Sequence, residues 1–160
     1  MHKEFDQLWF LNDEVSKDLT IINNAIKAAV VVIIFKNTLG KSVLYLIERN
    51  TYDGHHSGQM ALPGGKMDHV DANLSETALR EVQEEIGVIL ESDQLFPLTP
   101  QWIHVSNHWV QPFYTIVYEK PIFTLNKREI NCIFEIPIST FKDSNTLAFH
   151  ELNILGNKVI

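Results

Sequence analysis

The sequence is poor in cysteine, in long apolar runs and in positive charge. Cys132 is the single cysteine among 160 residues, so no disulfide can form within the chain. The longest apolar run, residues 28–35, is far shorter than the ~20 residues that a membrane-spanning helix needs. The first residues include Glu4 and Asp6 and lack the basic and then apolar pattern of a secretory signal. We therefore expect a cytoplasmic protein that does not associate with a membrane.

Basic residues are outnumbered by acidic ones. The chain has 13 Lys and Arg against 20 Asp and Glu, which gives a net charge of -7 with neutral histidines. An acidic surface repels the phosphates of nucleic acids, and this argues against a nucleic-acid-binding protein. A small anionic substrate remains compatible with this charge, provided that a cation mediates its binding. The length predicts one domain covering residues 1–160.

Strand patterns lie on both sides of a central helix. Residues 28–35 are rich in Val and Ile, which predicts a strand buried on both faces. Residues 42–48 follow a turn-forming segment and predict the second strand of a hairpin. Residues 110–118 and 129–136 predict further strands. The latter is expected to be a half-buried strand, in which Cys132 is a small buried hydrophobic side chain rather than a nucleophile. This order of elements predicts a mixed α/β domain.

The clearest helix spans residues 75–86. Either Ser75 or Asn73 can cap its first turn, and Gly87 stands where a left-handed C-cap belongs. The polar residues 50–58 upstream predict a surface loop.

Three glutamates lie at spacings of three and four on this helix: Glu81, Glu84 and Glu85. Their carboxylates therefore project from one face, while the adjacent arc is apolar. An acidic face is often only a solvated surface. It also suits a hard divalent cation, because such ions prefer oxygen ligands.

A glycine-rich segment, residues 62–66, precedes the helix with the sequence Leu-Pro-Gly-Gly-Lys. Glycines allow the backbone to approach a bound group closely, and the carbonyl of Gly64 can add a neutral oxygen ligand. The ammonium group of Lys66 could meet a phosphate. This segment is not a Walker loop, because Met60 and Met67 stand where that motif requires Gly and Ser or Thr.

Residues 80–88, Arg-Glu-Val-Gln-Glu-Glu-Ile-Gly-Val, resemble the second half of the Nudix box, G-x5-E-x7-R-E-U-x-E-E-x-G-U with U aliphatic. The first half departs from this pattern, since fourteen residues rather than thirteen separate Gly65 from Arg80. The first glutamate of the box falls on Asp71 when counted from Gly65, and on Ala72 when counted back from Arg80. The resemblance implies a mainly structural role for that position and a lengthened loop.

A box lengthened in this way is similar to the coenzyme A pyrophosphatase branch of the Nudix family. That branch carries an upstream motif resembling L-L-T-x-R-S-x3-R-x3-G-x3-F-P-G-G. This chain matches it in register at Arg49, Gly58 and residues 63–65. The resemblance as a whole spans residues 28–137. The departures from the upstream motif are Tyr45, Ile47, Asn50, Leu62 and Gly54, the last of which replaces the second arginine.

The resemblance implies an α/β/α sandwich with a mixed sheet, in which the box forms a loop-helix-loop. It implies Mg²⁺ or Mn²⁺ as cofactor, and hydrolysis of the pyrophosphate bond of coenzyme A or an acyl-coenzyme A to 3′,5′-ADP and (acyl-)phosphopantetheine. The implied metal ligands are Glu81, Glu84, Glu85 and the Gly64 carbonyl. The implied catalytic residues are Glu81 or Glu84 as proton acceptor, with Arg80 orienting a box carboxylate and with Glu129 and Glu135 as further candidate bases. The implied substrate contacts are Arg49, His56, Gln59 and Lys66.

Other functions remain open at this point. The same chemistry could act on ADP-ribose, a dinucleotide or a nucleoside triphosphate. The domain could instead bind a nucleotide without cleaving it, or the acidic helix could be purely structural. Proteins of this kind often form homodimers. They usually continue into a C-terminal helix, so we expect this chain to lack that helix or to end differently after the strand-like residues 152–155.

Overall fold

The computed structural model describes residues 19–36, 38–50, 58–143, 152–154 and 157–159, with no account of the side chains before residue 22 or after residue 143. Within these residues, a mixed sheet is formed by β1 Ile26–Lys36, β2 Ser42–Arg49, β3 Met60–Ala61, β4 Gly64–Lys66, β5 Phe96–Pro97, β6 Gln101–Ile103, β7 His108–Val117 and β8 Ile130–Pro137. A separate two-stranded sheet contains β9 Leu152–Ile154 and β10 Asn157–Val159. The helices are α1 Leu19–Asn24 and α2 Leu74–Ile86, with 3₁₀ turns at Ser92–Gln94, His104–Ser106 and Ile138–Lys142.

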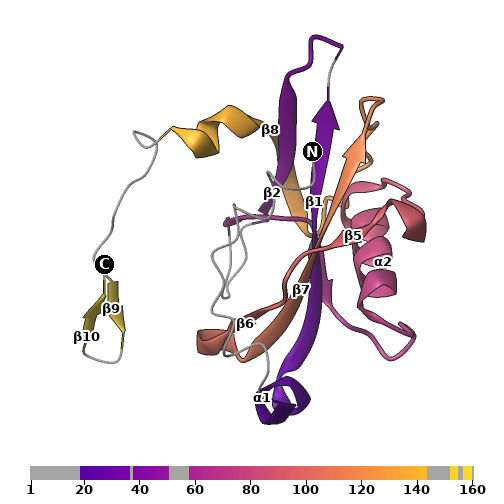
Figure 1. The fold of residues 1–160 in the computed structure, drawn as a ribbon. Coiled ribbons are helices and arrows are strands. Elements are labelled where there is room, and N and C mark those ends of the chain that lie inside the picture. Colours follow the sequence, from indigo (N-terminus) through magenta and orange to yellow (C-terminus); the bar gives the residue numbers. More distant parts are fainter. Residues whose placement is uncertain (1–18, 37, 51–57, 144–151, 155–156, 160) are drawn as a thin grey trace.

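The long strand β1 lies at the centre of the main sheet (Figure 1). On one side it pairs in parallel with β7, in a register that runs from Ile26 opposite His108 to Phe35 opposite Val117. On its other side it pairs antiparallel with two strands in turn, first with β4 and then with β2. The β1–β2 pairing confirms the predicted hairpin, and β7 and β8 confirm the two later strands.

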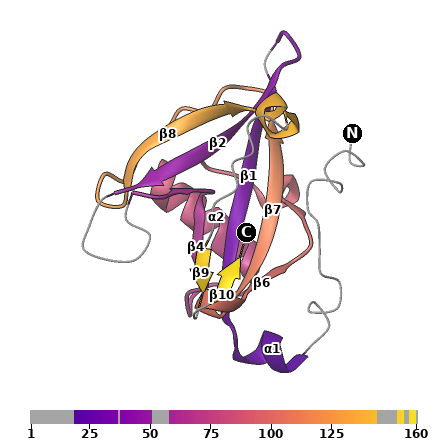
Figure 2. The same cartoon turned by 90° about the vertical axis from the view of Figure 1, so that its left-hand side faces the viewer.

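The sheet divides where β2 leaves β1. Beyond this point β2 continues in antiparallel pairing with β8 and β3, and Figure 2 shows β2 and β8 fanning away from β1 and β7. The short strand β4 takes the vacated place beside β1, and the amide of Val31 donates to the carbonyl of Pro63 at 2.9 Å. Gly64 and Gly65 are therefore built into the sheet. The sequence did not predict a strand for this segment, because glycine has little strand preference and tertiary pairing decides its conformation here.

Helix α2 covers one face of the sheet, as Figure 1 shows. Its apolar arc packs against the inward side chains of β1, and all of these are fully buried: Ala78, Val82, Ile86, Ala29, Val31 and Ile33. Burying each Val or Ile stabilises the fold by roughly 1.5–3 kcal/mol. On the other face of β1, Val30 and Val32 are only half-buried, so the expected burial on both faces holds only in part. The predicted sandwich of helix on mixed sheet is confirmed.

The caps of α2 fix where it begins and ends. Of the two residues expected to cap it, Asn73 is the one that does so. Its Oδ1 accepts hydrogen bonds from the amides of Ser75 at 2.9 Å and Glu76 at 3.1 Å. At the other end Gly87 adopts a φ of 72°, a left-handed conformation that glycine reaches without steric cost. The three box glutamates consequently lie in the last two turns of the helix.

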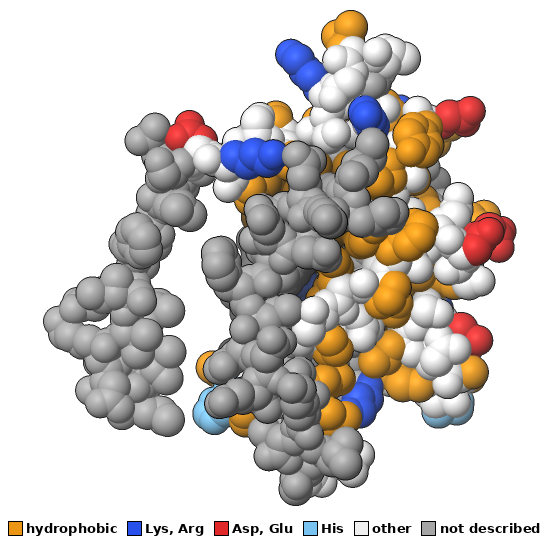
Figure 3. Space-filling view, in the orientation of Figure 1, with side chains coloured by type: hydrophobic (Ala, Val, Ile, Leu, Met, Phe, Trp, Pro, Cys, Tyr) orange, Lys and Arg blue, Asp and Glu red, His pale blue; other side chains and the backbone are white. Residues whose placement is uncertain are grey.

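The described surface carries scattered hydrophobic side chains, as protein surfaces ordinarily do. Hydrophobic side chains reach it at several points, as the orange atoms in Figure 3 show, and Leu39, Val105 and Ile122 are among the most exposed. None of the described helices is both long and apolar enough to cross a membrane. Cys132 on β8 is only half-buried rather than buried, because β8 is exposed along much of its length. Residues 51–57 of the predicted loop lie outside the described residues.

Candidate active site

Glu85 is a buried acid at the point where the sheet divides. Only 1% of the residue is exposed. One carboxylate oxygen accepts a hydrogen bond from the amide of Gly64 on β4 at 2.9 Å, and the other lies 3.5 Å from Nη1 of Arg49 at the end of β2. Burial raises the pKa of Glu85 to about 7, and the charges of Glu81 and Glu129 add to the rise, whereas the Gly64 amide and Arg49 oppose it.

The second box acid, Glu81, lies against the glycine pair. A Cβ atom on Gly65 would come within 2.5 Å of the Glu81 carboxylate, which explains why this position needs glycine. Position 64 requires glycine for a different reason. Its φ is 149°, and a Cβ there would lie 2.2 Å from the carbonyl oxygen of Ala29. Burial also raises the pKa of Glu81, against the opposing effect of Arg80. One buried and one half-buried carboxylate thus face the glycine backbone of β4.

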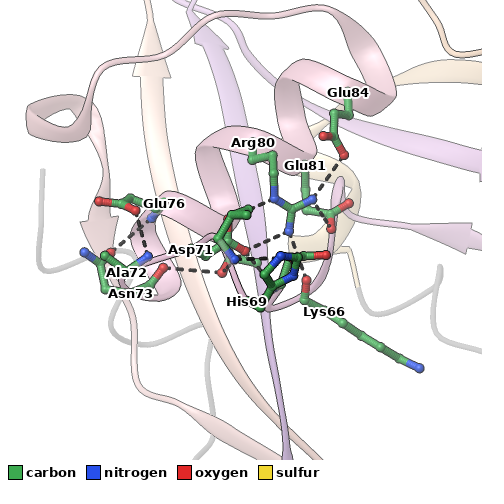
Figure 4. A network of polar contacts seen from close by, with 12 residues as sticks. Lys66, His69, Asp71, Ala72, Asn73, Glu76, Arg80, Glu81 and Glu84 are labelled. Atoms are coloured by element: carbon green, nitrogen blue, oxygen red, sulfur yellow. Dashed lines mark hydrogen bonds and ion pairs between the residues drawn. The ribbon is translucent and has the colours of Figure 1, made fainter.

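Arg80 organises the outer side of this acid group, and Figure 4 shows its guanidinium at the centre of the network. It donates to Asp71 through Nε at 2.9 Å and Nη2 at 2.8 Å. Nη1 lies between Glu81 at 2.9 Å and Glu84 at 3.1 Å, and Nη2 also reaches the Lys66 carbonyl at 3.1 Å. All five guanidinium hydrogens are therefore used. The predicted pairing of Arg80 with box carboxylates is present in the structure.

Asp71 takes the place of the first acid of the box, which resolves the choice between Asp71 and Ala72. Asp71 is 8% exposed, and besides Arg80 its carboxylate accepts from Thr77 Oγ1 at 3.0 Å and from the Asp68 amide at 2.8 Å. These donors, with Arg80 first, lower the pKa of Asp71. The spacing from Gly65 to Asp71 is that of the box pattern, so the additional residue lies between Asp71 and Arg80, where the helix begins.

The donor set fits a hard divalent cation by its chemistry. The carboxylates of Glu81, Glu84 and Glu85 and the carbonyl of Gly64 are all oxygen ligands. In the part of the chain that the structure describes, no three acidic, His or Cys side chains are gathered as a ready metal site. Nη1 of Arg80 lies between Glu81 and Glu84 instead. Each of these two glutamates uses one carboxylate oxygen for Arg80, which leaves its other oxygen available as a ligand.

The expected substrate contacts are spread around this group. Arg49 lies beside Glu85, and its amide donates to the Gln59 carbonyl at 3.0 Å, so these two residues are neighbours. The side chain of Lys66 is exposed and points away from the carboxylates in Figure 4, although its carbonyl binds Arg80. His56 lies outside the described residues. The roles of all four remain predictions.

The two further candidate bases lie in different places. The charge of Glu129 raises the pKa of both Glu81 and Glu85. The turn that carries Glu129 is bonded to the end of α2, since the amide of Asn126 donates to the Glu85 carbonyl at 2.9 Å. Glu135 lies on β8 opposite Tyr45 of β2, and its carboxylate forms an ion pair with Lys120 rather than contacting the box. Sequence patterns give no signal for this difference, because it depends on how the residues before β8 dock onto α2.

The chain belongs to the Nudix family, because the sequence pattern of the NUDIX domain matches residues 25–146, most of its length. It is similar to an uncharacterized Nudix hydrolase, NudL, of Pectobacterium atrosepticum, with 36% identity over 95 residues that cover 59% of this chain and 50% of that protein. The chain thus spans about half the length of the curated relatives it matches. The resemblance to the Nudix family is confirmed, and its coenzyme A branch stays a prediction.

Solved structures share the fold at low sequence identity. An Ap4A hydrolase of C. elegans in a binary complex superimposes with a TM-score of 0.59 and 19% identity, covering 72% of this chain and 82% of that one. The NUDIX domain of Shewanella oneidensis NrtR in complex with ADP ribose gives a TM-score of 0.57 and 15% identity, covering 83% of this chain and 87% of that one. These likenesses confirm the Nudix architecture.

Proposed function

We propose that this domain hydrolyses the pyrophosphate bond of a nucleoside diphosphate derivative, with coenzyme A or an acyl-coenzyme A as substrate and Mg²⁺ or Mn²⁺ as cofactor. The products are 3′,5′-ADP and (acyl-)phosphopantetheine. The observation that carries the proposal is the placement of Glu85. It is a buried carboxylate held by the Gly64 amide, beside Glu81 and close to Arg49. A buried acid next to like charges is costly unless a cation and a function justify it.

The cation would be held by Glu81, Glu84, Glu85 and the Gly64 carbonyl. When bound, it supplies charge neutralisation at the phosphate oxygens and a more acidic water. Among the protein groups, Arg49 would bind a phosphate oxygen, and its position beside Glu85 with 28% of its side chain exposed supports this role. Asp71 holds Arg80, and Arg80 in turn orients Glu81 and Glu84.

The proton of the attacking water goes to a carboxylate of this group. Glu81 suits this role better than Glu84, because its side chain is only 15% exposed and burial raises its pKa. The side chain of Glu84 is 57% exposed and is placed at the outer edge of the group. Excluding water around Glu81 and Glu85 strengthens every charge interaction with the substrate.

A second substrate class is supported by the comparisons rather than by the site. One similar structure is an Ap4A hydrolase and another contains ADP ribose. Gly54 replaces the second arginine of the coenzyme A motif, which removes one cation for a substrate phosphate. ADP-ribose, a dinucleotide or a nucleoside triphosphate is therefore the alternative substrate. A domain that only binds its nucleotide is the alternative outside catalysis.

Product analysis after incubation with a substrate panel tests these proposals. The panel contains coenzyme A, acetyl-coenzyme A, ADP-ribose, NADH and nucleoside triphosphates, each with and without Mn²⁺. Glu85→Gln is expected to abolish turnover. Glu76→Gln, on the same helix but bound to the Ala72 amide, is the matched control and should leave it unchanged. Release of 3′,5′-ADP supports the coenzyme A branch, and cleavage of another substrate rejects it. Mn²⁺-dependent nucleotide binding without any product would favour the binding domain.

A further inference from the structure

Residues 126–130 form a turn organised around Asn126. The carbonyl of Asn126 accepts from the amides of Glu129 at 3.0 Å and Ile130 at 2.8 Å. Its side-chain Oδ1 accepts from the Arg128 amide at 3.2 Å, and its Nδ2 donates to Oε1 of Glu129 at 3.1 Å. One asparagine thus fixes both the backbone of the turn and the carboxylate of Glu129.

This turn is fastened to the end of α2. The amide of Asn126 donates to the carbonyl of Glu85 at 2.9 Å, and the amide of Thr124 donates to the carbonyl of Ile86 at 2.9 Å. These are among the last carbonyls of the helix, which have no partner within it. Gly87 allows the close approach, because a Cβ there would lie 2.7 Å from Cβ of Thr124. The residue that holds Glu129 is therefore bonded directly to the backbone of Glu85.

A second attachment comes from the end of β2. The amide of Asn50 donates to the carbonyl of Glu129 at 2.7 Å, and its Nδ2 donates to the carbonyl of Lys127 at 2.6 Å. Asn50 follows Arg49, the cation beside Glu85. The turn is thus held from two directions around Glu85, by α2 and by β2.

We propose that Asn126 is a positioning residue that holds the Glu129 carboxylate against the acid group formed by Glu81 and Glu85. Glu129 is exposed and carries the same charge as Glu81 and Glu85. An unrestrained glutamate would turn toward solvent, because that relieves repulsion and keeps its rotamer freedom. The Nδ2–Oε1 bond opposes this movement. This inference rests on the proposed function, and it adds Glu129 to the site as a fourth carboxylate.

The test compares Asn126→Ala with Asn131→Ala. Asn131 is the matched control, since its Nδ2 also donates to a glutamate, Oε2 of Glu48 at 2.7 Å, but on the β2–β8 pair and without a bond to α2. Asn126→Ala should lower kcat by roughly 10–100-fold, the usual effect of losing a group that orients a site carboxylate, with little change in KM. It should also speed amide hydrogen exchange at Arg128 and Glu129. Asn131→Ala should change none of these.

A double-mutant cycle separates positioning from general destabilisation. If Asn126 acts through Glu129, then Asn126→Ala has no further effect on kcat in a Glu129→Gln background. An equal loss in both backgrounds, or an unchanged kcat in the single variant, overturns the inference. If the wild-type domain cleaves nothing, the proposed function fails, and amide hydrogen exchange then tests the positioning role of Asn126. Faster exchange confined to residues 127–130 in Asn126→Ala supports the positioning role, and unchanged exchange there rejects it.

Discussion

Arg80 and Asp71 face each other edge to edge, with Nε to Oδ1 at 2.9 Å and Nη2 to Oδ2 at 2.8 Å. The pair joins the loop after β4 to the middle of α2. The additional residue of the box is accommodated between the two partners without separating them. A planar guanidinium and a carboxylate match in this geometry, which lysine could not reproduce.

Replacing Asp71 by Asn should destabilise the fold. The change removes the charge from a buried carboxylate with Arg80, Thr77 and the Asp68 amide as donors, so we expect a loss of about 2 kcal/mol in the free energy of unfolding. Urea unfolding measures it. Asp68→Asn is the control, because half of its side chain is exposed, and it should change stability by much less.

The pairing of Asp71 with Arg80 predicts that the stability of the fold depends on pH. The pKa of Asp71 is lowered in the folded state. Its stabilising contribution is therefore complete above the unfolded pKa of about 3.9 and is lost as the pH falls through the lower folded value. The difference in stability between wild type and Asp71→Asn should shrink below about pH 4. A difference that stays constant from pH 7 to pH 2 would contradict the assigned pair.

The two glycines of β4 should respond differently to alanine. In Gly65→Ala the new methyl group meets the end of the Glu81 side chain, which can move, so the fold should survive while Mn²⁺ affinity and turnover fall at least ~10-fold. In Gly64→Ala it meets the backbone of Ala29, and the chain should lose several kcal/mol of stability or fail to fold. Thermal unfolding and Mn²⁺ titration distinguish the two. Equal stability of both variants would show that the backbone of β4 is less constrained.

Tyr45 offers a stabilising substitution. It is fully buried, packs edge-on against Phe123 with ring centroids 4.8 Å apart, and has a hydroxyl without a hydrogen-bond partner among the described residues. Burial, with the charge of Glu135, raises its pKa to about 12. Tyr45→Phe keeps the ring and removes the unpaired group, so stability should rise by about 1 kcal/mol. Tyr118→Phe is the exposed control. A loss of stability in Tyr45→Phe would reveal a partner for the hydroxyl.

Arg49 should contribute more to the free energy of unfolding in the metal-free domain than in the metal-bound domain. Removing its guanidinium takes away the positive charge beside the buried Glu85, which we expect to cost about 1–2 kcal/mol in the metal-free domain. With saturating Mn²⁺ the loss should be smaller, because the metal would supply the missing positive charge. Denaturant unfolding with and without Mn²⁺ measures both values, and Lys142→Ala is the surface control. An equal loss under both conditions would argue against metal binding at Glu85.

Local patterns were sufficient to predict much of the fold. The continuous run of Val and Ile in residues 28–35 and the turn-forming segment after it predicted the β1–β2 hairpin. The cap residues and glutamate spacing predicted α2 almost to its ends. These features depend on neighbours in sequence, which is why a single sequence is enough to reveal them. The short strand β4 depends on pairing with β1, so its glycines gave no local signal for it.

The site was predictable in its composition rather than in its arrangement. The box pattern identified Arg80 and the three glutamates, but it could not decide between Asp71 and Ala72 until Asp71 was found against Arg80. It also gave no indication of Asn126, whose amide bonds to the carbonyl of Glu85 in α2, more than forty positions away in the sequence. Such contacts depend on how the sheet and the helix are arranged in space, which the local sequence does not reveal.

The parallel pairing of β1 with β7 has a consequence for folding kinetics. Strand β1 begins at Ile26 and its partner begins at His108, so the whole box lies inside a long closed loop of chain. Closing such a loop costs entropy before its contacts repay it, and proteins rich in distant pairings fold slowly. Glu85 also needs β4, β2 and the segment before β8 around it. In pulse-labelling experiments the amide of Gly64 should therefore gain protection late, together with β7 rather than with the β1–β2 hairpin.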